Sequence, residues 1–249
     1  MPRKLLATAS LVGTLLLTGG RPTTLKLPLA LVTSQELKEL VSQLLAKLLP
    51  KSQRILTDEE ESNLSEAISK TLGLKASFSL EGNRLNNQWG LMGLEQHLPR
   101  YPGDTLAGRN FTQVGITPGR GAWGYFASSK ATLASADVER EKYYVVVQTL
   151  YLPDWGKHTK YLRDWYKYRK VLVINPATGT AVVGVVGDAG PAKFTGRQFG
   201  GSPQVMHDLG FYPKTHEGRV LLLFVDDPDD KIPLGPVTQP LTKPQPKLV

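Results

Sequence analysis

The feature that most constrains the fold is the segment 170–191, KVLVINPATGTAVVGVVGDAGP. Two apolar runs, Val171–Ile174 and Ala181–Val186, flank the turn sequence NPATG. Val-rich runs of this length bounded by turn residues predict two strands joined in a hairpin. The second run leads directly into GDAGP, where glycines allow tight turns and the proline cannot continue a strand ladder. We therefore expect Asp188 at the end of a strand, either as an acid of a functional site or as a residue that caps its own turn.

The order of the pieces in and after this segment resembles that of the RlpA-like double-psi β-barrel family. Its members have a strand, an N-P-x-x-G turn, a Val-rich strand, D-x-G-P, G-R and a short helix that begins S-P. In this chain the pieces are Asn175-Pro176 with Gly179, Val182–Val186, Asp188 to Pro191, Gly196-Arg197, and Ser202-Pro203 opening Gln204–Leu209. The match covers residues 170–225 and departs from the family in two places. Gly200-Gly201 stand where an acid is usual, and the family's Ala-Ala-His strand end has no counterpart.

The resemblance implies a mainly β fold, a six-stranded double-psi β-barrel, and with an N-terminal helical hairpin the whole chain is expected to be α+β. The same barrel hosts lytic transglycosylases, expansins and non-catalytic wall-binding modules, so the fold alone does not give the activity. In a lytic transglycosylase one acid protonates the glycosidic oxygen and then, as a carboxylate, helps the C6 hydroxyl of the sugar attack the anomeric carbon. Asp188 is the expected acid, with a pKa raised by partial burial, and Arg197 or His158 would orient the substrate. The alternative is an expansin-like glycan-binding module, in which Asp188 only forms a turn.

The N-terminal residues predict export. Arg3 and Lys4 precede an apolar run from Leu5 to Leu17, which small residues follow. A basic start, an apolar core and small residues are typical of a secretory signal peptide over residues 1–20, with the mature chain starting near Arg21. The run is short for a transmembrane helix, and a buried N-terminal helix is the alternative. We therefore expect a protein that is secreted or held in the cell envelope.

Residues 21–85 predict a helical region. Ser34–Leu49 carries apolar residues at helical spacing, and a second helix is expected from Thr57, with Glu60 completing a capping box, to Gly73. We expect the pair to pack on the barrel as a helical hairpin. The alternative is that these helices bind a membrane surface or an envelope protein partner, in a structural role.

The barrel is expected over residues 86–237, with a long insertion over 86–170 and a proline-rich tail at 238–249. Further strands are predicted at Tyr143–Leu150 and Arg219–Val225, with alternate residues facing inward. Asn86–Thr105 and Gly119–Ala127 are dense in glycine, proline and aromatic residues, and ordered loops of this kind are often functional. Glu95, His97, Arg100 and Asp104 crowd the first of them. The predicted inward-facing core residues are Val145, Val147, Leu172, Ile174, Val183, Val185, Leu221 and Leu223.

Residues 151–170 interleave aromatic and basic side chains. Trp155, Trp165 and Tyr168 are candidates to stack on sugar rings, and His158 and neighbouring lysines and arginines are candidates to bind carboxylates. We expect at least one of the two tryptophans to share a groove with Asp188. The alternative is a half-buried amphipathic helix whose charges are solvated.

Charge and residue types narrow the expected partners. A formal net charge of +8 favours an anionic partner, and the predicted export favours peptidoglycan or another glycan polymer over nucleic acid. The chain has no cysteine, which excludes disulfides and a thiol nucleophile. A single histidine beside Glu95 is no metal motif, and the acidic turn at 226–230 lacks the glycine and spacing of a calcium loop. We therefore expect no metal and no cofactor.

Overall fold

The computed structural model describes residues 32–241, which form an α+β structure. The predicted signal peptide and the end of the predicted tail, residues 242–249, lie outside the described residues. The described part holds five α-helices, ten strands and four short 3-10 turns. The helices are α1 (Ser34–Leu48), α2 (Asp58–Leu72), α3 (Ser135–Lys142), α4 (Trp155–Tyr166) and α5 (Pro203–Asp208). The strands are β1 (Ala76–Ser77), β2 (Ser79–Leu80), β3 (Asn83–Arg84), β4 (Trp89–Leu94), β5 (Tyr144–Val147), β6 (Lys170–Ile174), β7 (Ala181–Ala189), β8 (Phe199–Gly201), β9 (Glu217–Val225) and β10 (Gly235–Pro236). The 3-10 turns are η2 (Thr112–Val114), η3 (Lys130–Thr132), η4 (Thr149–Tyr151) and η5 (Lys193–Thr195).

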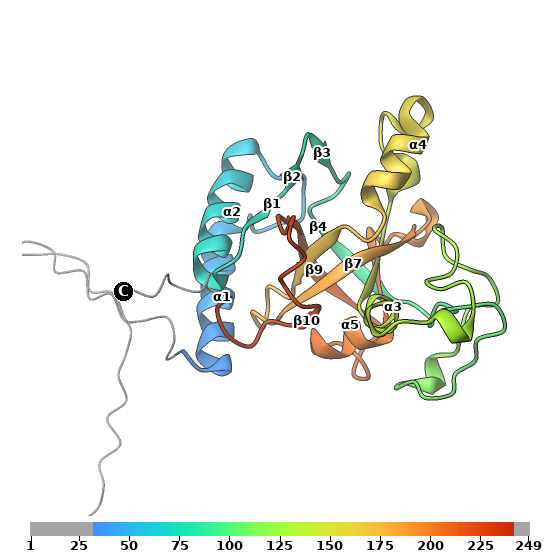
Figure 1. Cartoon of the computed structure of the whole chain (residues 1–249). Helices are drawn as coiled ribbons and strands as arrows, with labels where there is room; N and C mark the ends of the chain where they lie inside the picture. Colours follow the sequence, from blue (N-terminus) through green and yellow to red (C-terminus); the bar gives the residue numbers. More distant parts are fainter. Residues whose placement is uncertain (1–31, 242–249) are drawn as a thin grey trace, which may run out of the picture. The chain divides into compact units, whose positions relative to one another are not determined.

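Strands β4 to β9 close into a six-stranded barrel of mixed direction (Figure 1). β4 pairs antiparallel with β9 and parallel with β8. β5 pairs antiparallel with β8 and parallel with β7. β6 closes the ring by pairing antiparallel with both β7 and β9. The predicted six-stranded closed barrel is therefore confirmed. β5 falls in the strand predicted at Tyr143–Leu150, whereas β4 lies in Asn86–Thr105, so the prediction of a loop there is wrong for this part.

The barrel interior is filled by apolar side chains from all six strands. The predicted inward residues Val145 and Val147 belong to this cluster. The helix α5 contributes Val205 and Met206, and its N-cap Ser202 accepts a hydrogen bond from the N–H of Val205 at 3.2 Å. The strand residues of the interior are Met92, Val145, Val147, Val171, Val173, Val182, Val186, Phe199, Val220, Leu222 and Phe224.

The prediction of inward-facing residues is wrong for three strands. Leu172, Ile174, Val183, Leu221 and Leu223 are buried, but they belong to a second cluster on the outer face of the barrel, with side chains of α1 and α2. β6, β7 and β9 are apolar on both faces because one face lines the interior and the other packs under helices. A strand buried on both faces shows no alternation of apolar and polar residues that would tell the faces apart.

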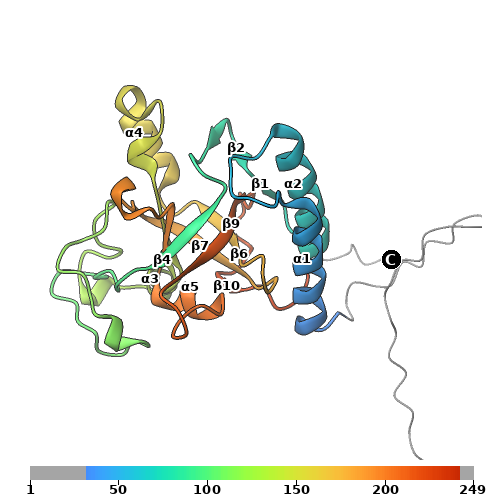
Figure 2. The same ribbon diagram turned by 180° about the vertical axis from the view of Figure 1, so that it is seen from behind.

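The helices α1 and α2 lie side by side against this outer face, as both views of the chain show (Figures 1 and 2). Each begins with a capping box, Thr33 with Glu36 and Thr57 with Glu60, which satisfies N–H groups that a helix start leaves unpaired. Gly73 ends α2 at φ 67°, a left-handed conformation that suits glycine. No helix of residues 32–241 is long and apolar enough to cross a membrane.

The turn between β6 and β7 is built by the predicted NPATG sequence. The side-chain oxygen of Asn175 accepts a hydrogen bond from the N–H of Ala177 at 3.1 Å, which holds the turn. Gly179 follows at φ 70°, and a Cβ at this position would overlap the carbonyl oxygen of Lys38 in α1. Glycine is therefore required both by the backbone conformation and by the close approach of the first helix.

The predicted strand at Tyr143–Leu150 is shorter in the structure. β5 ends at Val147, and the turn η4 follows. The segment between β4 and α3, residues 95–134, has no strand and only two 3-10 turns, and it lies on the side of the barrel away from α1 and α2 (Figure 1).

Candidate active site at the rim of the barrel

Asp188 lies near the end of β7, where a bulge changes the direction of its side chain. The parallel ladder between β5 and β7 pairs Val145 with Val186 and then Val146 with Asp188, so Gly187 has no partner. Bulges of this kind re-aim a side chain and are frequent beside active sites. Only glycine fits at the bulge, because a Cβ on Gly187 would overlap the side chain of Tyr144.

One oxygen of the Asp188 carboxylate is held by the backbone. Oδ1 accepts hydrogen bonds from the N–H groups of Ala122 at 2.7 Å and Ala189 at 2.8 Å. Oδ2 has no hydrogen-bond partner among residues 32–241. Burial raises the pKa of Asp188, and the two N–H groups offset only part of that rise. Asp188 is therefore both a turn-forming residue and an acid with one free oxygen.

The loop that carries Ala122 is fixed by α4. Arg163 donates to the carbonyl oxygen of Ala122 at 3.1 Å, and the indole N–H of Trp123 donates to the carbonyl oxygen of Arg163 at 2.7 Å. Trp123 is itself buried against the barrel interior. The GRGAWG loop is thus held between α4 and Asp188, which makes it part of the rim of the site.

Glu95 is the second acid of the site, and it follows β4 directly. Its carboxylate has no hydrogen-bond partner within the described part of the chain. Burial, and then the negative charge of Asp188, raise the pKa of Glu95 to about 7, although the positive charge of Arg197 opposes them. Glu95 therefore holds a proton in a large share of molecules at neutral pH.

Glycines make room for the side chains around this acid. A Cβ on Gly200 of β8 would overlap Oε1 of Glu95, and a Cβ on Gly93 of β4 would lie 2.6 Å from Cδ of Arg197. β4 and β8 run parallel, with Gly93 opposite Gly200. The resembled family usually has an acid at the position of Gly200-Gly201. In this chain the missing side chain of Gly200 leaves the space that the carboxylate of Glu95 occupies.

Arg197 and Tyr144 complete the surroundings of the two acids. Arg197 is about one-third exposed and pairs with Glu217 at 3.2 Å, and its positive charge acts on Glu95. The hydroxyl of Tyr144 donates to the carbonyl oxygen of Gln96. Burial first, and then the charges of Glu95, Glu141 and Asp188, raise the pKa of Tyr144, which keeps the phenol neutral. The arrangement is two neighbouring carboxyls of unequal acidity, one cation and a fixed phenol.

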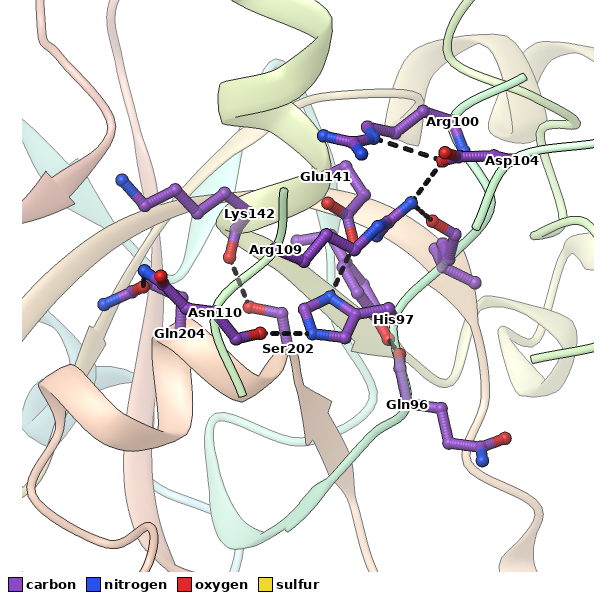
Figure 3. A network of polar contacts seen from close by, with 12 residues as sticks. Gln96, His97, Arg100, Asp104, Arg109, Asn110, Glu141, Lys142, Ser202 and Gln204 are labelled. Atoms are coloured by element: carbon purple, nitrogen blue, oxygen red, sulfur yellow. Dashed lines mark hydrogen bonds and ion pairs between the residues drawn. The ribbon is translucent and has the colours of Figure 1, made fainter. Parts of the chain in front are cut away.

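A buried charge network fastens the segment that follows Glu95 (Figure 3). The ring of His97 lies between the carboxylate of Glu141, with Nδ1 3.0 Å from Oε1, and the carbonyl oxygen of Asn110, which is 2.9 Å from Nε2. The carbonyl oxygen of Asn110 can only accept a hydrogen bond, so Nε2 is the donor in that contact. Arg109 also pairs with Glu141 and continues the network to Asp104.

Asp104 is the far end of this network. Burial alone would raise its pKa, but hydrogen bonds from the backbone and side chain of Arg100 and the charge of Arg109 bring it down to about 2. The carboxylates of Asp104 and Glu141 and the guanidinium of Arg109 are all at most 3% exposed. The network ties residues 97–110 to α3 and so fixes the strand end from which Glu95 projects.

The structure places the predicted aromatic residues in several different environments. Trp165 is 8% exposed, packs edge-on against Phe224, and donates its indole N–H to Glu81 at 2.8 Å. Trp155 is half-buried at the start of α4 and packs against the interior cluster. His158 is exposed and shares with Trp165 an open hollow along α4 that does not include Asp188.

The ring of Tyr168 stacks on Phe126 with the ring centres 5.6 Å apart, and Cζ of Arg140 lies 5.0 Å from the Tyr168 ring centre. It lines a different hollow, of about 580 Å³, between α3 and the β9–β10 loop. Of the predicted site residues, the structure therefore brings Asp188 and Arg197 together around Glu95, whereas Trp165, His158 and Tyr168 line other surfaces.

The sequence did not predict that Glu95 and Asp188 lie near each other. A signal was present, since each acid follows a strand that contains glycine, WGLMGLE and AVVGVVGD. No group of three or more His, Cys, Asp or Glu side chains that could hold a metal ion occurs in residues 32–241.

Neither a scan against protein-family models nor a search of curated proteins found a match to this chain. The closed six-stranded barrel is compatible with the RlpA-like resemblance, which continues to depend on the motifs of residues 170–225 alone.

Proposed function

We propose that this protein cleaves glycosidic bonds of a glycan strand, with Glu95 as the general acid and Asp188 as its carboxylate partner. The observation that carries the proposal is the carboxyl of Glu95, whose pKa is about 7 beside a second acid. A general acid works best when its pKa lies near the working pH, and unequal neighbouring acids are the pattern of glycosidase sites.

The hydrogen bonds divide the roles between the two acids. The N–H groups of Ala122 and Ala189 stabilise the charged form of Asp188, whereas no hydrogen bond from residues 32–241 stabilises the charged form of Glu95. Glu95 therefore keeps its proton near neutral pH and gives it to the leaving oxygen. Asp188, as a carboxylate, stabilises the positive charge that develops on the sugar ring or activates the attacking hydroxyl.

We propose peptidoglycan as the polymer and the cell envelope as the place of action. The support is the signal-peptide pattern of residues 1–20, the net charge of +8 and the order of motifs in residues 170–225. Within this proposal the barrel is of the double-psi type, and α1 with α2 form its N-terminal helical hairpin. The attacking hydroxyl is the C6 hydroxyl of the sugar in a lytic transglycosylase and water in a hydrolase.

The test is incubation of the full chain with purified peptidoglycan sacculi and analysis of the released fragments by mass. We expect Glu95→Gln and Asp188→Asn to lose cleavage and Glu66→Gln to keep it, because Glu66 is an exposed carboxylate on α2 with no ion pair in the described part of the chain. Fragments with 1,6-anhydro ends identify a lytic transglycosylase, and reducing ends identify a hydrolase. Cleavage that survives in both site variants would overturn the proposal, as would intact sacculi after incubation with the wild type at pH 5 to 7.

A second candidate is a non-catalytic glycan-binding module. The observation that favours it is the capture of Asp188 Oδ1 by two backbone N–H groups, the geometry of a turn-forming aspartate. In that case the sacculi bind the protein and remain intact.

A further inference from the structure

A third hollow, of about 380 Å³, is related to the acid pair through Arg197. The side chain of Arg197 lines this hollow, crosses over Gly93 and acts by its charge on Glu95. The hollow contains two cations and no carboxylate. Its lining residues are Asn86, Asn87, Gln148, Tyr151, Lys193, Arg197 and Gln198.

The amide side chains of the hollow are held in fixed positions. Gln148 donates to the carbonyl oxygens of Pro191 at 3.0 Å and Arg197 at 3.1 Å. Asn86 and Asn87 donate in turn to the backbone oxygen of Gln148 at 3.0 Å and to its side-chain oxygen at 3.2 Å. One N–H of each asparagine amide is therefore engaged, while the side-chain oxygens have no partner in residues 32–241. These oxygens are preorganised acceptors for the N–H or O–H groups of a ligand.

Exposed apolar side chains lie on η4 and η5, the two turns that supply Tyr151 and Lys193 to this hollow. Tyr151 and Leu150 of η4 are 38% and 53% exposed, and Phe194 of η5 is 93% exposed. Lys193 lies over the ring of Tyr151, with Nζ 4.7 Å from the ring centre, and this contact joins the two turns. Aromatic faces of this kind cover the apolar C–H faces of a sugar ring, because they offer large contact areas with little loss of side-chain freedom.

We propose that this hollow is a binding subsite for an acidic, N-acylated sugar unit of the glycan strand, adjacent to the bond that Glu95 cleaves. The asparagine oxygens accept the N–H of the acylamino group, Tyr151 packs under the ring, and Lys193 binds the carboxylate. Lys193 has no ion pair in the described part of the chain, whereas Arg197 is already paired with Glu217. A cation without an ion pair beside fixed acceptors distinguishes an acidic amino sugar from a neutral one. The inference rests on the proposed function for the identity of the polymer.

The experiment measures binding separately from cleavage. The parent protein is the full chain with Glu95→Gln and Asp188→Asn together, and the probes are chitotetraose and a muramic-acid-containing tetrasaccharide with free lactyl carboxylates. Calorimetric titration at low salt should show that the acidic probe binds about tenfold more tightly than chitotetraose, about the effect of one added charge-assisted contact. Lys193→Ala should abolish this preference. Tyr151→Ala should lower the binding affinity for both probes about tenfold.

Lys231→Ala is the matched control, because Lys231 is an exposed lysine that pairs with Asp229 away from the hollow. It should bind both probes as the parent does. Equal affinity of the parent for the two probes would overturn the inference. Parent-like binding by both Lys193→Ala and Tyr151→Ala would overturn it too.

The outcomes for the subsite and for the proposed function are distinguishable. Selective binding of the acidic probe together with intact sacculi would refute the glycosidase and keep the subsite. Cleaved sacculi together with binding that neither variant alters would refute the subsite and keep the glycosidase.

Discussion

Replacing Glu95 by glutamine should make the fold increasingly more stable than the wild type as the pH rises, because glutamine cannot ionise. The carboxyl of Glu95 has a pKa of about 7 in the folded chain against an ordinary value of 4.5. A group whose folded-state pKa is raised contributes stability below its unfolded pKa and loses it as the pH rises through its folded pKa. The stability that the neutral carboxyl provides is thus complete below about pH 4.5 and is lost by about pH 7 to 8.

The magnitude follows from the pKa difference. At about 1.4 kcal/mol per pKa unit, the rise from 4.5 to about 7 corresponds to about 3.5 kcal/mol. Solvent reaches this half-buried carboxyl and screens part of the effect, so we expect about 2 to 3 kcal/mol. The free energy of unfolding of Glu95→Gln, minus that of the wild type, should increase by this amount between about pH 4.5 and 7.5 and then stay constant.

The assay is urea unfolding followed by tryptophan fluorescence at a series of pH values. Glu66→Gln is the control, because the same chemical change at an exposed site of α2 should give a difference from the wild type that does not depend on pH. If the free energy of unfolding of Glu95→Gln relative to the wild type changes with pH no more than that of the control from pH 5 to 8, the carboxyl of Glu95 is not held neutral by its surroundings. The division of roles within the pair would then be refuted.

Three further predictions concern the same site and its support. Asp188→Asn should lower the pKa of Glu95 but leave it above 4.5, because burial is the larger cause of its rise; a carboxyl NMR titration that shows an unchanged pKa would contradict this. Gly200→Ala should abolish cleavage and cost about 1 to 3 kcal/mol, because its Cβ overlaps Glu95; full activity of that variant in the sacculus assay would show that the space left by Gly200 is dispensable. Glu141→Gln should destabilise the chain by about 3 to 5 kcal/mol, because it leaves the buried Arg109 without one of its carboxylates; thermal unfolding that shifts by less than the equivalent of about 1 kcal/mol would argue against this support.

The sequence predicted the barrel well where local signals were strong. The NPATG turn, the flanking strands and the capping boxes of α2 all occur as expected, because turns and caps are decided by a few neighbouring residues. Which side chains of β6 and β9 point into the barrel and which point outward was not predictable from neighbouring residues. Leu172 and Leu221 are apolar like Val171 and Val220, so hydrophobicity along the strand does not separate the two faces, and the packing of α1 and α2 decides which set lies outside.

In the candidate site, too, features set by neighbouring residues were predictable and features set by tertiary contacts were not. Asp188 was singled out because the residues beside it form a recognisable turn. The nearness of Glu95 depends on β4 lying parallel to β8 with Gly200 beneath the carboxylate, a contact between residues far apart in the sequence. Trp165 looked like a binding residue because aromatic and basic residues alternate around it, yet burial against Phe224 and a hydrogen bond to Glu81 hold it in the interior. Periodicity alone does not say which side of an isolated helix will be covered.

The apolar outer face of β6, β7 and β9 has a consequence for how the chain can be divided. Because α1 and α2 cover Leu172, Ile174 and Leu223, a protein shortened to begin at residue 75 would display a continuous leucine- and valine-rich surface to water. Surfaces of this size cause self-association, so the shortened barrel should precipitate or form oligomers even if its six strands still close. The first two helices therefore keep the barrel soluble, and a shortened protein meant to retain Glu95 and Asp188 in a folded, monomeric barrel must keep these helices as well.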